Sequence, residues 1–166
     1  LDAQGIKYTV YDGVQPNPSI ENIEEARRLY LKNGCEGIIA FGGGSPMDCA
    51  KAAGARVMNP NQSVSQMRGE LKIRHKLPPF FAVPTTAGTG SETTLAAVVT
   101  NMQTHEKYAI NDPKLRPKYA VLDPELTTGL PQKITSTTGM DALTHAVEAY
   151  IGLSGVKSTD DYAERA

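Results

Sequence analysis

Two short apolar runs each lead directly into a glycine-rich turn, and this feature constrains the fold more than any other. Residues 37–41 read Gly-Ile-Ile-Ala-Phe and are followed by three glycines, whereas residues 79–83 read Pro-Phe-Phe-Ala-Val and lead into the turn at residues 84–91. Brief continuous apolar runs are typical of the buried strands of a parallel sheet. We therefore predict an α/β fold in which both glycine-rich turns follow strand ends.

Helix and strand signals alternate along the first part of the chain. Residues 17–19 and 33–34 read as the start and stop of one helix, and a second helix follows the three glycines and continues through Ala55. Residues 95–100 and 107–110 form the pattern of a hairpin. Further strand patterns occur at residues 8–11 and 119–122. This order predicts that the first part of the chain is α/β.

The strand signals end after Pro131, and residues 138–150 read as a helix. We place a domain boundary near Thr128, with an α/β domain over residues 1–128 and the start of a helical domain over residues 129–166. The chain opens with Leu1 instead of methionine, and residues 160–166 resemble the opening of a helix without a stop signal. We therefore expect a fragment whose second domain is truncated.

Charge and composition give no support for several classes of partner. With 17 Lys and Arg against 18 Asp and Glu, the formal net charge of −1 gives no reason to expect attraction to nucleic acid or membranes. No apolar run approaches a membrane helix in length, and no signal-peptide pattern opens the chain. Cys35 and Cys49 match no zinc-ligand spacing and are too few for a disulfide framework. We expect buried thiols in a soluble, cytoplasmic protein.

The first glycine-rich turn, residues 42–48, joins a predicted strand to a predicted helix. Capping would explain Ser45 at the N-cap and Pro46 at the first helical position. Consecutive glycines also let a ligand approach the main chain, where amide groups and the helix dipole suit a phosphate. The turn is not a P-loop and lacks the usual dinucleotide spacing of glycines. Phosphate binding and an ordinary tight turn both remain open.

The second turn, residues 85–91, adds small hydroxyl side chains to two glycines at the end of another predicted strand. Open α/β sheets bind ligands at this end of their strands. A flexible surface loop is the alternative interpretation. Two such turns together favour a nucleotide more than either does separately.

Asp141 and His145 are four residues apart on the last predicted helix. Their side chains therefore lie on one face, one turn apart, and both can reach a single divalent metal. Glu148 follows on nearly the same face. Two ligands make an incomplete metal site. The alternative is a surface Asp–His pair beside an ordinary core stripe, which would consist of Leu143, Ala146, Val147 and Tyr150.

Residues 42–48, 84–92 and 139–148 together resemble motifs of the iron-containing (group III) alcohol dehydrogenase family, in order and spacing. The resemblance covers nearly the whole chain from about Tyr8 onward. It implies a Rossmann-like dinucleotide-binding domain with a mostly parallel sheet, followed by the first part of an all-helical metal-binding domain. In the family, metal and substrate occupy the cleft between the two domains.

The resemblance also implies roles for individual residues. Asp141 and His145 match the first two metal ligands, and the family takes further histidines from later helices that this chain does not contain. Asp48 is expected to order its own helix. The residues expected to bind NAD or NADP are Gly43, Gly44 and Ser45 at the pyrophosphate, Thr85, Thr86 and Thr94 along the pocket, and Lys107 at a ribose or phosphate oxygen.

The implied function is an oxidoreductase that moves hydride between NAD(P) and a small alcohol or aldehyde. The metal, Fe²⁺ or in some members Zn²⁺, acts as a Lewis acid on the substrate oxygen. Dimers are common in the family. Because this chain offers half of a coordination shell, we expect little turnover from it alone, and the sequence identifies no catalytic acid or base. Two alternatives are a related Zn²⁺ glycerol dehydrogenase or cyclase, and a nucleotide-binding module without catalysis.

Overall fold

The structure is a computed structural model that describes residues 1–153 and 155–166. The described residues form two compact units. The first contains Leu1–Pro84 and Ser91–Leu122, and the second contains Thr85–Gly90 and Asp123–Ala166. Because the second glycine-rich turn belongs to the same unit as the C-terminal residues, the two units are not separated by a single boundary in the sequence. The domain boundary near Thr128 remains a prediction.

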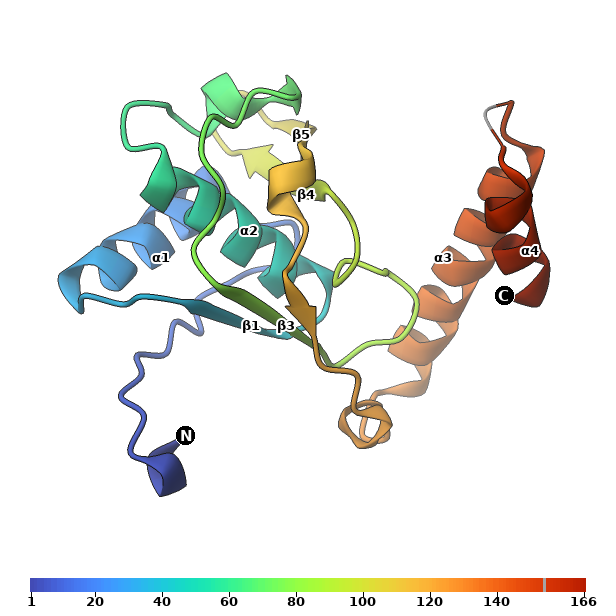
Figure 1. Cartoon of the computed structure of the whole chain (residues 1–166), viewed down its shortest axis with the longest axis horizontal. Coiled ribbons are helices and arrows are strands. Elements are labelled where there is room, and N and C mark those ends of the chain that lie inside the picture. Colours follow the sequence, from blue (N-terminus) through green and yellow to red (C-terminus); the bar gives the residue numbers. More distant parts are fainter. Residues whose placement is uncertain (154) are drawn as a thin grey trace. The chain divides into compact units, whose positions relative to one another are not determined.

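A parallel sheet forms one layer of the first unit. Its strands are β1 (Ile38–Gly42), β3 (Phe80–Pro84) and β6 (Tyr119–Ala120), in the order β1-β3-β6 (Figure 1). The two apolar runs therefore form neighbouring parallel strands, as predicted. Their register pairs Gly42 with Pro84. Both glycine-rich turns consequently begin at the same edge of the sheet.

This sheet is buried on one face and exposed on the other among the described residues, although its apolar runs predict burial on both. Ala40, Phe80 and Ala82 are buried on the covered face, where they pack against Met47. Exposed apolar residues of the other face include Ile39, Phe41 and Phe81, the last of which stacks on Tyr119 with ring centroids 4.6 Å apart. The alternation arises because α2 packs on only one side of the strands.

Two helices cover the first unit as the sequence predicts. Helix α1 (Ile20–Lys32) begins at a capping box formed by Ser19 and Asn22 and ends at Asn33. Helix α2 (Gly44–Met58) carries buried small residues that pack against α1 and against a second sheet. Small side chains let α2 approach the elements on both of its sides. The buried small residues of α2 are Cys49, Ala52, Ala53, Gly54 and Ala55.

The second sheet of the first unit contains the predicted hairpin. Strands β4 (Ala96–Asn101) and β5 (Glu106–Asn111) pair antiparallel, and β2 (Gly69–Glu70) adds to β5 in parallel. Val99 and Ile110 point into the main core beside α2. In the described part of the chain, short 3-10 turns occur at Asp2–Gln4, Ser65–Met67, Pro113–Leu115 and Pro124–Thr127.

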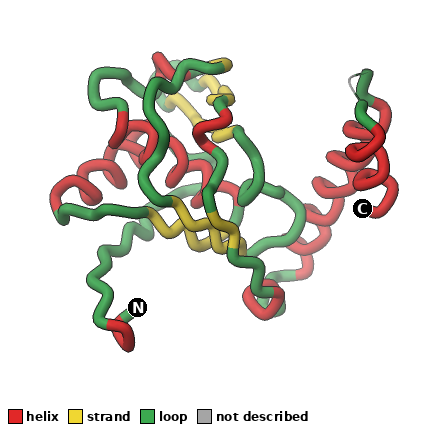
Figure 2. The backbone as a smooth tube through the Cα atoms, in the orientation of Figure 1, coloured by secondary structure: helices red, strands yellow, loops and turns green. Residues whose placement is uncertain are grey.

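The strand predicted at residues 8–11 does not form. Figure 2 shows loop between the first 3-10 turn and α1, and residues 1–10 are all exposed. Alternating apolar residues form a strand only beside another strand that accepts and donates main-chain hydrogen bonds. Within the described residues, this segment has no such neighbour. Instead, Tyr11 donates its hydroxyl hydrogen to Glu25 of α1 at 3.0 Å.

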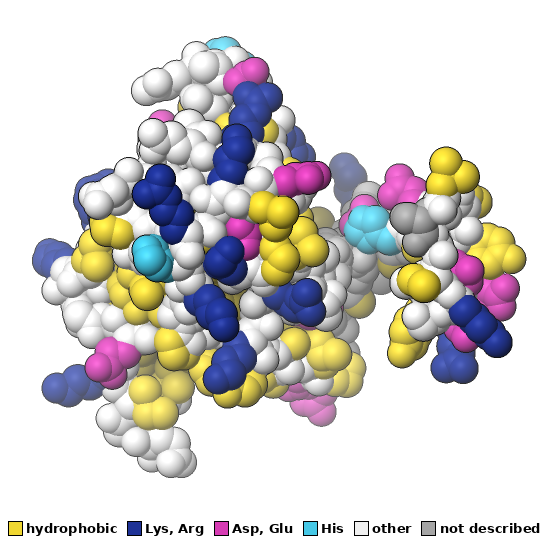
Figure 3. All heavy atoms as spheres, turned by 45° about the horizontal axis from the view of Figure 1, so that its top comes forward, with side chains coloured by type: hydrophobic (Ala, Val, Ile, Leu, Met, Phe, Trp, Pro, Cys, Tyr) yellow, Lys and Arg dark blue, Asp and Glu magenta, His cyan; other side chains and the backbone are white. Residues whose placement is uncertain are grey.

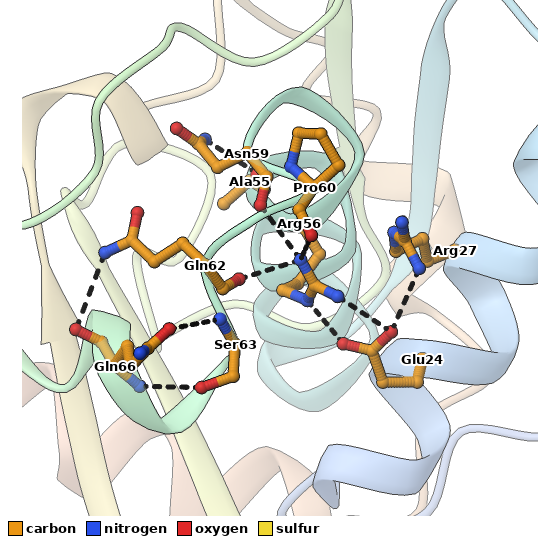
Figure 4. Close-up of polar contacts among 9 residues, drawn as sticks. All are labelled: Glu24, Arg27, Ala55, Arg56, Asn59, Pro60, Gln62, Ser63 and Gln66. Atoms are coloured by element: carbon orange, nitrogen blue, oxygen red, sulfur yellow. Dashed lines mark hydrogen bonds and ion pairs between the residues drawn. The ribbon is translucent and has the colours of Figure 1, made fainter.

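A buried arginine joins α1, α2 and the loop that follows α2 (Figure 4). Arg56 forms a bidentate ion pair with Glu24 of α1. The same guanidinium donates to the main-chain oxygens of Asn59 at 2.9 Å and Gln62 at 2.7 Å. Arg27 contacts the same carboxylate from one turn along α1, at 3.4 Å. Arg56 is thus the central donor of this network.

Helices form most of the second unit. Helix α3 (Gln132–Ile151) contains the predicted helix 138–150 and begins six residues earlier, and α4 (Lys157–Arg165) follows. Residues 160–165 are therefore helical as predicted, but they end α4 and do not open it, because the helix begins at Lys157. No helix in the described part of the chain has the length and apolar character needed to cross a membrane.

The charges are unevenly distributed over the surface. Figure 3 shows a run of Lys and Arg side chains on one face of the molecule. Exposed cations lie in two segments of the chain, beside the buried residues Ile73 and Leu115. The exposed cations of these segments include Lys72, Arg74, Lys76, Arg116 and Lys118. The net charge of −1 is therefore a sum over surface regions of different charge. The expected absence of a nucleic-acid partner remains a prediction.

Candidate functional site

The first glycine-rich turn requires glycine at Gly42. Its φ of 147° is unfavourable for other residues, and a Cβ atom there would lie 2.8 Å from Cγ of Pro46. Gly43 is the N-cap of α2, which begins at Gly44. The prediction that Ser45 caps the helix is wrong, because Ser45 is the second helical residue. Main-chain N–H groups at such a helix start have no partner within the helix and can donate to a phosphate.

Ser45 and Lys107 are linked through a residue that the sequence did not identify as part of the site. The main-chain N–H of Asn17 donates to Ser45 Oγ at 3.2 Å, and Lys107 Nζ donates to Asn17 Oδ1 at 2.7 Å. Asn17 has a φ of 56°, which asparagine tolerates better than most residues. Its position before Pro18 predicted a helix start, and no local pattern distinguished that role from a bridge to residues far along the chain.

The second glycine-rich turn contains an unsatisfied polar atom. Thr86 Oγ1 is buried and has no hydrogen-bond partner in the described structure. Buried hydroxyl groups are normally paired, so this oxygen is suited to a bound ligand. Thr85 precedes it and is partly buried. The turn also packs on α3, where Gly88 lies directly against the main chain of Thr138.

Asp48 joins separate elements of the first unit and does not order its own helix, contrary to the expectation from the family resemblance. Its carboxylate accepts hydrogen bonds from Ser91 Oγ at 3.0 Å and from the main-chain N–H of Val98 at 3.1 Å. Asp48 therefore connects α2 to the segment after the second turn and to β4. Burial raises the pKa of this carboxyl group, although the Val98 N–H, the charge of Lys51 and the Ser91 hydroxyl oppose the rise.

Thr94 is held by a buried cation. Lys51 is fully buried on α2, and its Nζ donates to Thr94 Oγ1 at 2.9 Å and to the main-chain oxygens of Thr94 and Ala96 at 3.2 and 3.0 Å. Nζ also donates to Ser91 Oγ at 3.2 Å. Lys51 was not predicted as part of the site. A lysine after a glycine-rich turn, on the buried face of a helix, is the signal that could have identified it.

The predicted metal ligands lie together on α3. Nε2 of His145 is 3.7 Å from Oδ1 of Asp141, and the two side chains are 52% and 46% exposed. Imidazole and carboxylate groups suit Fe²⁺ and Zn²⁺. Among the described residues, no third His, Cys, Asp or Glu joins them in a cluster. The pair thus supplies two ligands of a metal site.

The alternative reading of α3 is wrong in its core stripe, although the Asp141–His145 pair does lie at the helix surface. Leu143, Val147 and Tyr150 are each about half exposed, and only Ala146 of the four stripe residues is buried. Glu148 is exposed as well. Within the described residues, this face of α3 is therefore accessible around the Asp141–His145 pair.

The two thiols differ in their surroundings. Cys49 is buried as predicted, and burial raises the pKa of its thiol to about 12. The thiol therefore stays protonated and is a poor nucleophile near neutral pH. Cys35 is only partly buried, and both thiols are free.

An α/β unit in which two neighbouring parallel strands end at the same edge of the sheet, each followed in the chain by a glycine-rich turn, has the form of a dinucleotide-binding fold. The sequence matches the family model for iron-containing alcohol dehydrogenase over residues 1–124. Since this match covers most of the chain, the protein belongs to the iron-containing alcohol dehydrogenase family. The predicted membership of this family is thus confirmed.

Individual relatives extend the match beyond residue 124. The 1,3-propanediol dehydrogenase of Klebsiella pneumoniae is 41% identical over 166 residues, covering 100% of this chain and 43% of the relative. Alcohol dehydrogenase 4 of Schizosaccharomyces pombe is 41% identical over 160 residues, covering 96% of this chain and 38% of the relative. The chain therefore spans about two fifths of the length of these relatives.

A solved structure with bound cofactor has the same fold. Sulfoacetaldehyde reductase from Bifidobacterium kashiwanohense, in complex with NAD⁺, aligns with a TM-score of 0.85 at 37% identity. The alignment covers 94% of this chain and 42% of that chain. The predicted α/β fold is therefore confirmed together with the family.

Proposed function

We propose that the protein is an oxidoreductase that transfers hydride between NAD or NADP and a small alcohol or aldehyde, with Fe²⁺ or Zn²⁺ as cofactor. When bound, the metal would supply a Lewis acid for the substrate oxygen, and the nicotinamide would supply or accept the hydride. Family membership supports this reaction class, and relatives with similar sequences are named alcohol dehydrogenase and 1,3-propanediol dehydrogenase.

The contact between Gly88 and Thr138 carries the proposal. It joins the second glycine-rich turn to α3, three residues before Asp141, within one compact unit. A nucleotide-binding turn and a metal-binding helix that pack directly on each other are arranged for a reaction that uses both cofactors. A nucleotide-binding module without catalysis would not need the Asp141–His145 pair on this helix.

The residues of the first unit fit a dinucleotide. Gly43 and Gly44 offer main-chain N–H groups at the start of α2, where the helix dipole favours a pyrophosphate. Ser45 and Lys107 lie around Asn17 and add a hydroxyl group and a positive charge. These groups would bind and orient the cofactor without taking part in bond making.

Three threonines add hydroxyl groups to the proposed cofactor site. The unpaired hydroxyl of Thr86 supplies a group that a ligand can satisfy. Thr94 presents a hydroxyl group held by Lys51, and Thr85 completes the threonine set. Hydroxyl groups both donate and accept hydrogen bonds, so they can bind phosphate, ribose or carboxamide groups.

Asp141 and His145 fit two positions of a metal site. Their atoms are close enough to share one ion, and their half-exposed side chains leave it accessible to further ligands and to substrate. A cytoplasmic location is part of the proposal, because the free thiols of Cys35 and Cys49 suit a reducing compartment. A homodimer is proposed from the family alone.

Cofactor binding tests the first half of the proposal. NADH and then NADPH are titrated into the protein while nicotinamide fluorescence is followed, in parallel with Gly43→Val and Gly129→Val. A β-branched side chain at Gly43 should block the approach of the pyrophosphate and weaken binding by about tenfold or more. Gly129 is exposed, and a Cβ atom there would meet no other atom within 4 Å, so the Gly129→Val variant should bind like the parent.

Hydride transfer tests the second half. With Fe²⁺ supplied under exclusion of oxygen, the intact protein should reduce NAD or NADP in the presence of 1,3-propanediol or ethanol, and chelation should stop the reaction. The 166-residue chain alone, which offers two metal ligands, should show little turnover. Saturable cofactor binding without metal-dependent turnover in the intact protein would favour the non-catalytic nucleotide-binding module. Absence of cofactor binding in a folded protein would contradict the proposal as a whole.

A further inference from the structure

Lys51 is a buried cation whose hydrogen bonds are all committed. It is fully buried, and its three ammonium hydrogens face four acceptors, namely Ser91 Oγ, Thr94 Oγ1 and the main-chain oxygens of Thr94 and Ala96. An ammonium group has no lone pair, so it can only donate. Each hydroxyl that it contacts must therefore act as an acceptor toward it.

The contact with Ser91 places a counter-charge near Lys51. Ser91 accepts from Lys51 and donates its own hydrogen to Asp48 Oδ1 at 3.0 Å. The ammonium and the carboxylate are thus bridged by one hydroxyl group. This arrangement balances a charge that would otherwise be costly to bury.

The contact with Thr94 has a consequence for ligand binding. Thr94 Oγ1 accepts from Lys51 at 2.9 Å, so its hydroxyl hydrogen must point away from Lys51. Thr94 is half-buried and is one of the proposed cofactor-binding residues. We infer that Lys51 is a positioning residue that fixes the Thr94 hydroxyl as a hydrogen-bond donor to an oxygen atom of the bound dinucleotide. This inference rests on the proposed function.

Loss of the proton from Lys51 would remove this constraint. A neutral amine carries a lone pair, so Thr94 could then donate to Lys51 instead of to the cofactor. Burial lowers the pKa of Lys51 to about 8, although the negative charges of Asp48 and Glu92 oppose this fall. The positive charge of Lys107, on β5, in turn lowers the pKa of Asp48. Cofactor affinity should therefore fall as the pH rises through about 8.

The test compares cofactor binding at several pH values in the whole protein. NADH dissociation constants are measured between about pH 7 and pH 9 for the parent and for Thr94→Val, which keeps the shape of the side chain but loses the hydroxyl. At the lower pH the parent should bind about threefold to tenfold more tightly than Thr94→Val. At the higher pH this ratio should shrink toward one.

A double-mutant cycle provides a second, independent measurement. If Lys51 acts through Thr94, Lys51→Met should weaken NADH binding, and the Lys51→Met/Thr94→Val double variant should be no weaker than the weaker single variant. Circular dichroism establishes whether each variant is folded. If Lys51→Met does not fold, the pH comparison of the parent with Thr94→Val still tests whether Lys51 positions the Thr94 hydroxyl.

The outcomes separate this inference from the proposed function. A parent that binds neither NADH nor NADPH at neutral pH overturns both. A parent that binds NADH, with a ratio to Thr94→Val that is constant over the pH range, overturns only the role of Lys51. Additive losses in the double-mutant cycle do the same.

Discussion

A Cβ atom on Gly88 would lie 1.9 Å from the main-chain oxygen of Thr138. No flexible side chain can yield at this contact, because the nearest atoms belong to the main chain of α3. Gly88 also has a φ of 138°, which residues with a Cβ atom rarely adopt. The second glycine-rich turn can therefore pack on α3 in this way only with glycine at position 88.

Gly88→Ala should destabilise the protein by about 3 kcal/mol, because it combines backbone strain with a steric clash. Urea unfolding followed by circular dichroism measures the change. Gly129→Ala is the matched control, since Gly129 is exposed and a side chain there meets nothing within 4 Å. Equal stability of the two variants would contradict the close packing of the turn on α3.

In the intact protein, His145→Ala should abolish metal retention while leaving NADH affinity within about twofold of the parent. Loss of one of two neighbouring ligands leaves Asp141 alone on this face of α3. Iron bound per chain, measured by atomic absorption after reconstitution and desalting, gives the first quantity. His75→Ala serves as the control because His75 is exposed in a loop of the other unit. Equal iron content in His145→Ala and the parent would rule out His145 as a ligand.

The ammonium group of Lys51 should titrate with a midpoint of about 8, well below the ordinary lysine value of 10.5, because burial disfavours its charge. Carbon-13 labelling of lysine Cε and NMR titration resolve this group from the exposed lysines. Asp48→Asn should lower the midpoint further, since the Asp48 carboxylate raises the pKa of Lys51. An upward shift in Asp48→Asn would contradict the charge balance through Ser91.

The same shift has a defined effect on stability. Because the pKa of Lys51 is lower in the folded protein than in the unfolded chain, the folded state releases this proton first as the pH rises. Between about pH 8 and pH 10.5 the unfolded chain therefore binds more protons at this group. The contribution of Lys51 to the free energy of unfolding increases across that window, and below it the charged group is a cost in the folded state.

Local sequence patterns predicted the elements whose signals lie within a few residues. The capping box at Ser19 and Asn22, and the two apolar runs, define α1, β1 and β3 because caps and periodicity act over one or two helical turns or strand pairs. The alternating pattern at residues 8–11 wrongly predicted a strand. A strand needs a neighbouring strand to pair with, and sequence alternation alone does not show whether one is present.

The polar contacts of the site were less predictable, because their partners are far apart in the chain. Asp48 hydrogen-bonds to Val98, fifty residues away, and Asn17 hydrogen-bonds to Ser45, which is twenty-eight residues away. Such contacts leave no periodic signal. Glycine positions and the Asp141–His145 spacing were visible in the sequence because the chemistry they permit depends on residue type and local geometry.

Arg56→Met should destabilise the protein by about 3 kcal/mol, whereas Arg27→Met should cost about 0.5 kcal/mol or less. Both arginines contact the carboxylate of Glu24, so the two variants remove the same kind of ion pair. Arg56 is buried and also satisfies main-chain oxygens in the loop after α2, and its loss leaves them without this donor.

The difference between the two variants isolates the effect of these loop contacts and of burial. Urea unfolding of both variants beside the parent gives the two free energies under identical conditions. Because methionine matches the apolar stem of arginine, packing is largely retained in each variant. Similar losses in the free energy of unfolding for Arg56→Met and Arg27→Met would mean that the network is held by the shared carboxylate alone. A larger loss for Arg56→Met would assign the difference to its buried main-chain acceptors.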